Sequence, residues 1–256
     1  MSKKNKVKTK VANRLSVKAV FGATFKLWRT NFNLFTKIVL VVAIPSSILN
    51  VLNSQGMVGE YGLLLSLAWS FVVIAILLLS NEKSELVSKK VGAIFTVASG
   101  RLLQYVAVSL ILLVFALPII ISLFGVILAQ SAFGIPLVIF LPIGLLAFVL
   151  GSYLLSCFSA SQAIAVNEGT GIYQSLKQSA EKTKKNRLRI FIGYFVLFVV
   201  ILMMLMIIQF VLSLNQAINE NAIVSGVIYI LEAVIFVPVV FIYQQKIYES
   251  LKNGKI

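Results

Sequence analysis

Residues 168–214 read EGTGIYQSLKQSAEKTKKNRLRIFIGYFVLFVVILMMLMIIQFVLSL and contain the unit from which the fold is predicted. The first half is polar, has the pattern of a surface helix and becomes densely basic, whereas residues 190–214 carry no charged side chain. At about 1.5 Å per residue, a helix of that length exceeds the roughly 30 Å hydrocarbon core of a bilayer. We therefore expect a basic surface helix that leads directly into a membrane-spanning helix.

The whole chain has the composition of a membrane protein. Of its 256 residues, 59% are hydrophobic and 12% are charged, and the mean hydropathy is +0.99; soluble domains carry about a quarter charged residues. The 23 Lys and Arg residues outnumber 8 acidic residues, all of them Glu. The basic residues form short blocks beside apolar spans, which is typical of membrane orientation and of contact with anionic lipid headgroups. Nucleic-acid binding is not predicted, because its motifs are absent.

The chain contains no His and no Asp, and Cys157 is its single cysteine. These absences exclude the usual zinc and non-haem iron sites, a Ser-His-Asp triad and an intramolecular disulfide. Ser156 and Ser159, like Cys157, would be nucleophiles without a His base, and Glu168 and Glu181 give no basis for an acid–base pair. We expect no enzymatic activity and no cofactor. A membrane enzyme ranks third, after the two hypotheses given at the end of this section.

The fold class predicted is all-α, a single membrane domain at residues 14–248. It is preceded by a basic, disordered tail at residues 1–13 and followed by a tail at residues 249–256. The six predicted spans are residues 34–52, 62–80, 102–128, 135–165, 190–214 and 222–245. Small residues recur at steps of four in the second span (Gly62, Ser66, Ser70) and in the fourth (Ser152, Ser156, Ala160), a pattern that allows close helix contact without any further function.

Three amphipathic segments precede the first, third and fifth spans. The first, residues 15–31, has Ser16 as its expected N-cap and suits the plane of the membrane interface, although a helix packed on the bundle has the same pattern. The three segments can be aligned, as shown by two sets of matched positions: Phe21, Phe95 and Leu176, and Thr24, Ala98 and Ser179. This alignment suggests three copies of a surface helix followed by a transmembrane hairpin.

Charge placement predicts the orientation. Ten basic residues precede or begin the first span, four lie between the second and third, six between the fourth and fifth, and three after the sixth, which accounts for all 23. The other three connections contain none. Because cytoplasmic connections carry the Lys and Arg excess, we expect both termini in the cytoplasm and the protein in the cytoplasmic membrane.

Glu232 is the first candidate for a binding site. It lies about ten residues into the sixth span, roughly 15 Å deep, and acids at that depth usually face the bundle interior or a cavity. Tyr229 and Ser225 precede it by three and seven positions and share its helix face. Glu232 is either a carboxyl that binds a proton or a substrate, or one side of an interhelical hydrogen bond. The candidate partners for that bond are Tyr153, Ser156 and Gln209.

The third basic connection is the second candidate, a site for anionic lipid headgroups. Its side chains are Lys177, Lys182, Lys184, Lys185, Arg187 and Arg189. Each basic residue near an anionic membrane surface contributes about 1 kcal/mol. Control of topology by the same residues is an equally good interpretation and is compatible with headgroup binding.

Three segments carry a family resemblance: SVKAVFGATFKLWRTNFNLFTKIVLVVAIPSSIL (residues 16–49), NEGTGIYQSLKQSAEKTKKNRLRIFIGYFVL (residues 167–197) and PVVFIYQQKIYESLKNGK (residues 238–255). Together they resemble the six-helix integral-membrane domain joined to some bacterial glycerophosphodiester phosphodiesterases, and stand-alone relatives of that domain. The resemblance covers nearly the whole chain and implies a prokaryotic multi-pass membrane protein. The phosphodiesterase domain has no counterpart here, and its catalytic His and paired acids are missing, so that activity is not implied.

The leading hypothesis is non-enzymatic transport or handling of a lipid or small amphiphile, with membrane lipids as partners on the cytoplasmic side. The alternative is a structural or regulatory scaffold that binds another envelope protein. A hydrophilic cavity reaching Glu232 would favour transport or lipid handling. A solid bundle with an exposed small-residue stripe would favour the scaffold. A pocket with two convergent acids would favour an enzyme.

Overall fold

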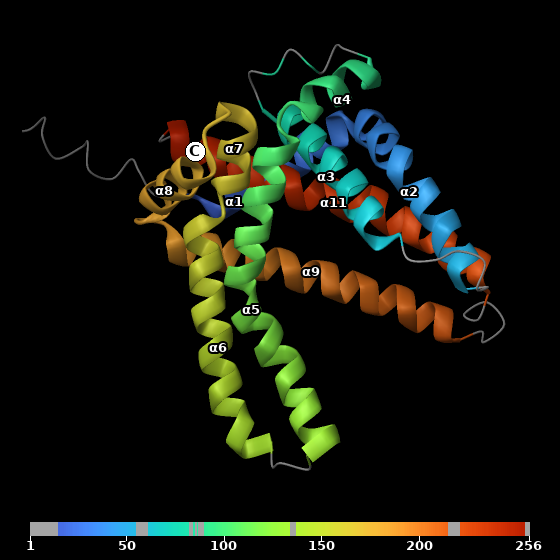
Figure 1. Cartoon of the computed structure of the whole chain (residues 1–256), viewed down its shortest axis with the longest axis vertical. Helices are drawn as coiled ribbons and strands as arrows, with labels where there is room; N and C mark the ends of the chain where they lie inside the picture. The colour runs from blue at the N-terminus through green and yellow to red at the C-terminus, as the bar shows by residue number, and fades with distance from the viewer. Residues whose placement is uncertain are drawn as a thin grey trace, which may run out of the picture.

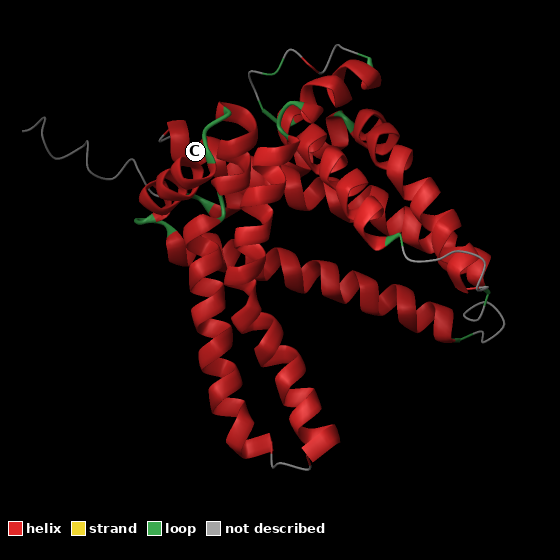
Figure 2. Ribbon diagram, viewed as in Figure 1, coloured by secondary structure: helices red, strands yellow, loops and turns green. Residues whose placement is uncertain are grey.

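The computed structural model describes the chain except residues 1–14, 55–60, 82, 83, 85, 87–89, 134–136, 215–220 and 254–256, and except the side chains of residues 53, 54, 63, 121, 123–133 and 137–141. All regular secondary structure in the described part is helical (Figure 2). The helices are α1 (Val17–Thr30), α2 (Phe32–Ser54), α3 (Gly62–Leu79), α4 (Val91–Ser99), α5 (Leu102–Phe133), α6 (Leu137–Phe158), α7 (Ser161–Glu168), α8 (Ile172–Thr183), α9 (Arg187–Ser213) and α11 (Ala222–Asn253). The all-α prediction is confirmed.

Five helical segments are long and apolar enough to cross a membrane. They are Phe32–Leu52, Leu102–Ile120, Pro142–Glu168, Arg187–Ser213 and Ala222–Lys252. The predicted second span corresponds to α3, which contains only a shorter apolar helix, Leu64–Leu79. The chain is therefore a membrane-embedded helical protein, and the second predicted span, with it the count of six, stays a prediction from the sequence.

The long helices diverge from one end of the molecule (Figure 1). The hairpin of α5 and α6 extends in one direction, α9 in another, and α2, α3 and α11 form a third group. Helices α1, α7 and α8 gather at the common end, where α11 also finishes. We call this the inner end, and the opposite ends of the long helices the outer ends.

Helix α11 is the centre of the packing, because it contributes to all three apolar clusters. Ile242 packs with α2 and α3, Tyr248 with α3, α5 and α7, and Tyr243 with α1 and α9. Lipid chains are as apolar as these side chains, so within a membrane close packing rather than the hydrophobic effect holds such helices together. By contrast, very little of the most apolar part of α9 is buried inside the protein.

Helix α1 begins after Ser16, as predicted. The Ser16 hydroxyl accepts a hydrogen bond from the N–H of Ala19 at 3.3 Å, which satisfies one of the free amides of the first turn. The first turn also contacts α9, since Leu15 N–H donates to Asn186 Oδ1 at 3.0 Å and Arg189 donates to Leu15 O at 2.9 Å. These bonds tie the start of the first surface helix to the start of α9.

The structure divides the predicted span at residues 135–165 into two helices, with a turn at residues 159 and 160. The carbonyl oxygen of Cys157 accepts hydrogen bonds from the hydroxyls of Ser179 (3.1 Å) and Thr183 (2.9 Å), and Ala160 N–H donates to Ser179 Oγ (3.2 Å). Side chains of α8 thus satisfy backbone groups that the break in the helix would leave without partners. From composition alone, residues 135–165 are predicted as one helix, because the side chains that satisfy the break come from α8, elsewhere in the sequence.

The C-terminal end of α11 also differs from the prediction. The sixth span was expected to finish near residue 245 and a tail to begin at residue 249, but α11 continues to Asn253 and residues 242–250 are all buried. The last turns of α11 pack against α7, α8 and α1. The polar residues after the apolar run are therefore part of the core at the inner end.

The positions aligned between the three surface helices have equal burial. Thr24, Ala98 and Ser179 are fully buried. The residues four positions earlier in each helix, Val20, Ile94 and Ser175, are fully buried too. Each of these helices is followed by two long helices in chain order.

Candidate functional site

Glu232 lies in α11 with its Oε1 atom buried, and this oxygen has no hydrogen-bond partner in the described part of the chain. The expected partners lie elsewhere: the Tyr153 hydroxyl accepts from Arg187 Nη1, Ser156 donates to the carbonyl of Ser152, and Gln209 is exposed on α9. An unpaired buried acceptor is unfavourable by about 1–3 kcal/mol. Glu232 is therefore an acid with an unpaired oxygen within the apolar length of α11, where the Tyr243 hydroxyl is also buried without a partner in the described part of the chain.

Tyr229 and Ser225 do not form a cluster with Glu232. The Tyr229 ring packs edge-to-face on Trp69 of α3, with ring centroids 6.5 Å apart, and Ser225 is exposed. Val239 and Tyr243, seven and eleven residues after Glu232, share its face of α11 by helical spacing. Both belong to the cluster that α11 forms with α1 and α9, so Glu232 lies on the α9-facing side, nearer the outer end.

The six basic candidates fall into two groups. Lys182 lies 3.5 Å from Glu168 Oε1, Arg187 donates to Tyr153 and to Ala180 O, and Arg189 donates to Leu15 O. These three side chains therefore hold α8 and α9 against their neighbours. Lys177, Lys184 and Lys185 are exposed and face the surroundings of the protein.

Glu168, the last residue of α7, connects three helices. Its Oε1 accepts a hydrogen bond from the Tyr248 hydroxyl at 2.7 Å and one from Lys252 Nζ at 3.2 Å, while Lys182 of α8 lies at 3.5 Å. Gly169, which follows, has φ 64° and ends α7 in the left-handed conformation that glycine adopts readily. A Cβ there would collide with the Arg101 guanidinium, so α7 ends beside a cation.

Buried amide side chains extend from this point across the inner end. Gln244 Nε2 donates to Gln162 Oε1 at 2.8 Å and to Ser159 O at 3.0 Å, and Gln162 Nε2 donates to Ser109 Oγ at 2.8 Å. The series links α11, α7 and α5. Such networks are stable only when most of their donors and acceptors are paired.

A second series reaches α3 and ends in a buried ion pair. Asn81 Nδ2 donates to Asn167 Oδ1, and Asn167 Nδ2 donates to Gln245 Oε1, both at 2.8 Å. Lys246 Nζ lies 2.7 Å from Glu249 Oε2, with side chains only 4% and 8% exposed. We call these groups together the inner polar layer; its members are Asn81, Ser109, Gln162, Asn167, Glu168, Gln244, Gln245, Lys246 and Glu249.

The inner polar layer was not predicted from the sequence. One sequence feature does indicate it: in the run YQQKIYE at residues 243–249, polar residues follow an apolar span without a Gly or Pro to end the helix. At the end of a membrane span, such a polar run is expected to be exposed, but in the structure α7 covers it. Helix α7 can reach this position only because the predicted fourth span is divided into α6 and α7.

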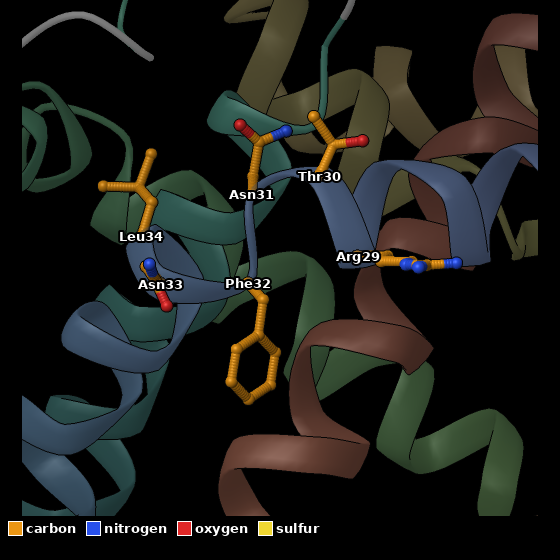
Figure 3. A pocket seen from close by; sticks show the side chains of 6 residues that line it. All are labelled: Arg29, Thr30, Asn31, Phe32, Asn33 and Leu34. Atoms are coloured by element: carbon orange, nitrogen blue, oxygen red, sulfur yellow. The ribbon is translucent and has the colours of Figure 1, made fainter.

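A pocket of about 290 Å³ lies at the corner between α1 and α2 (Figure 3). Its lining residues are Arg29, Thr30, Asn31, Phe32, Asn33 and Leu34. Asn31 forms the corner: its N–H and its Nδ2 both donate to Leu27 O, at 3.1 and 3.3 Å, and its carbonyl accepts the N–H groups of Leu34 and Phe35. The Thr30 and Asn31 side chains project from one side of the chain and the Phe32 ring from the other.

The described residues contain no group of three or more metal-ligating side chains. No protein-family model, curated protein or solved structure matches this chain. The resemblance to the membrane domain of the phosphodiesterases therefore stays a prediction from the three quoted segments.

Proposed function

We propose that this protein is a non-enzymatic membrane protein that transports or handles a lipid or small amphiphile. The observation that carries the proposal is the buried Glu232 Oε1, an acceptor without a donor in the described part of the chain and within the apolar length of α11. A hydroxyl or ammonium group of a ligand would supply the missing donor and recover the free energy that the unpaired oxygen loses.

Access from the membrane supports the same proposal. Glu232 is only half-buried as a residue, and it lies on the face of α11 that turns toward α9. In Figure 1, α9 runs separately from the group of α2, α3 and α11, and side chains along α9, such as Phe198 and Met206, are exposed. A lipid or amphiphile in the bilayer could therefore approach Glu232 without an aqueous pore.

The proposal includes six spans in three repeated units, with the inner end in the cytoplasm. The equal burial of Thr24, Ala98 and Ser179 in the three surface helices supports the repeat. The exclusive placement of Lys and Arg on one side of the predicted spans supports the orientation. Crossing of the membrane by α3 is part of this proposal and depends on the hydropathy of the sequence.

The first experiment compares lipids and metabolites that co-purify with the wild type, Glu232→Gln and Glu181→Gln in detergent, by mass spectrometry. Glu181 is exposed on α8, so Glu181→Gln makes the same chemical change away from the membrane interior. We expect one ligand class to be enriched in the wild type and in Glu181→Gln, and to be lost in Glu232→Gln. Identical bulk lipid in all three samples would overturn the proposal.

The second candidate function is a scaffold, favoured by the outer half of α3. Gly62 and Ser66 are exposed there, and the Ser66 hydroxyl donates to Gly62 O within the helix at 2.8 Å, so this small-residue face has no use inside the described fold. The other small-residue face, in α6, is buried. A protein that co-purifies in constant ratio, and is lost in Ser66→Phe but not in Glu232→Gln, would favour the scaffold.

A further inference from the structure

The N-terminal helices carry positive charge, and none of their basic side chains forms an ion pair within the described part of the chain. Residues 1–59 contain no acidic residue, whereas α1 and α2 contain Lys18, Lys26, Arg29 and Lys37. Arg29 is exposed, lines the α1–α2 pocket and forms no ion pair within the described part of the chain. An anionic partner from outside the protein would supply a counter-charge for this corner.

Two further basic residues, Lys26 and Lys37, lie close in helical spacing to residues that line the pocket. Lys26 lies three residues before Arg29, one turn along α1, and Lys37 lies four residues after Asn33, one turn along α2. All three basic side chains are exposed. One cation, Arg29, therefore lines the polar pocket, and two more lie one helical turn from residues that line it, an arrangement that favours an anionic group such as a phosphate.

Apolar side chains beside the pocket indicate the second part of the ligand. Phe25 and Phe32 are 43% and 37% exposed, and the Trp28 ring packs edge-to-face on Phe32 with centroids 5.2 Å apart. Aromatic rings next to cations are characteristic of the membrane–water interface. A soluble anion would have no use for these rings, but an anion that carries acyl chains would contact them.

We propose that the α1–α2 corner binds the phosphate headgroup of an anionic phospholipid, with the acyl chains against Phe25 and Phe32. The pocket volume of about 290 Å³ suits a headgroup and not a whole lipid. The proposal rests on the proposed function, since it assumes a membrane interface at α1. It specifies in addition that the lipid is anionic. It concerns residues that the Glu232 hypothesis does not use.

Trp28 provides a direct probe, because the chain has only two tryptophans, Trp28 and Trp69. The full chain with Trp69→Phe is placed in phosphatidylcholine bilayers containing increasing fractions of brominated phosphatidylglycerol, which quenches nearby tryptophan fluorescence. We expect saturable quenching of Trp28, stronger than that by equal fractions of brominated phosphatidylcholine. Arg29→Gln should weaken the apparent affinity for phosphatidylglycerol about fivefold.

Two matched variants test the assignment. Lys18→Gln removes one exposed positive charge from the start of α1, eleven residues and about 16 Å before Arg29, and should leave Trp28 quenching unchanged. Arg29→Lys keeps the charge and should retain most of the preference, which separates loss of charge from loss of fold. Equal effects of Arg29→Gln and Lys18→Gln, or equal quenching by the two brominated lipids, would overturn the proposal.

Inorganic phosphate distinguishes a lipid site from a site for soluble anions. We expect added inorganic phosphate, with ionic strength held constant by chloride, to leave the quenching curve unchanged. Full displacement by phosphate would assign the corner to a soluble ligand and overturn the phospholipid site. If the corner fails these tests while Glu232-dependent ligand enrichment persists, the proposed function stands without this site.

Discussion

At the residue scale, Glu168 shows how one carboxylate can determine the position of three helices. Tyr248, Lys252 and Lys182 all approach the same oxygen, so two ammonium groups are held close together only because the carboxylate lies between them. Removing the negative charge replaces attraction by repulsion between Lys182 and Lys252. The Lys252 side chain is half exposed, so screening by solvent limits the size of this repulsion.

We expect Glu168→Gln to lower the free energy of unfolding by about 1–2 kcal/mol, since hydrogen bonds to charged groups contribute about 1.5–3 kcal/mol and solvent screens part of that. Thermal unfolding of the purified protein, followed by tryptophan fluorescence, measures the change. Glu181→Gln is the control and should stay within about 0.5 kcal/mol of the wild type. Equal melting temperatures for the two variants would show that Glu168 does not stabilise the inner end.

At the element scale, the approach of α9 to α11 depends on a missing side chain. A Cβ on Gly193 would lie 1.8 Å from the Tyr243 hydroxyl oxygen, and Tyr243 is fully buried. The ring cannot move away freely because it packs against Phe21 and Tyr194, with centroids at 4.8 and 5.3 Å. Gly193 therefore sets the distance between the two helices at the inner end.

Gly193→Ala should destabilise the protein by about 1–3 kcal/mol, the usual penalty for overpacking a core. Gly22→Ala is the matched control, because no atom lies within 4 Å of a Cβ at that exposed helical position. There the change should be neutral or should stabilise α1 by up to about 1 kcal/mol. Equal melting temperatures for the two variants would mean that α9 does not pack closely on α11.

The elements also show what a sequence can predict and what it cannot. Helices α2 and α9 agree closely with predicted spans because their apolar runs are continuous and long. The turn between α6 and α7 was not predicted because its backbone groups are satisfied by Ser179 and Thr183 of α8. Those donors are adjacent to the turn only after folding, and no local pattern indicates them.

At the scale of the whole molecule, the most hydrophobic segment is not the structural centre. Residues 190–214 look like the organising helix because they lack any charge, but that same lack suits them to face lipid, and very little of the most apolar part of α9 is buried. Helix α11 is the centre, and its burial at residues 242–250 depends on Gln, Lys and Glu side chains. In the same way, the depth of Glu232 in the membrane is predicted from its position in a span, whereas the lack of a partner for its Oε1 depends on how the helices pack and has no signal in the sequence.

The orientation of the whole molecule can be tested by cysteine labelling, since the native Cys157 is buried. Lys184 is exposed at the end of α8, at the inner end, and Ser213 is exposed in the last turn of α9, at its outer end. A maleimide that cannot cross membranes is added to intact cells and to inverted membrane vesicles that contain Lys184→Cys or Ser213→Cys. The wild type is the control and should not react in either preparation.

The positive-inside distribution predicts that Lys184→Cys reacts only in inverted vesicles and Ser213→Cys only in intact cells. That outcome would put the inner polar layer and the α1–α2 corner on the cytoplasmic side, where anionic lipids are abundant. The reverse pattern would contradict the proposed orientation and would move the corner to the opposite leaflet. Reaction of both variants in the same preparation would mean that α9 does not cross the membrane, in which case Glu232 would lose its expected depth and the proposed function its main support.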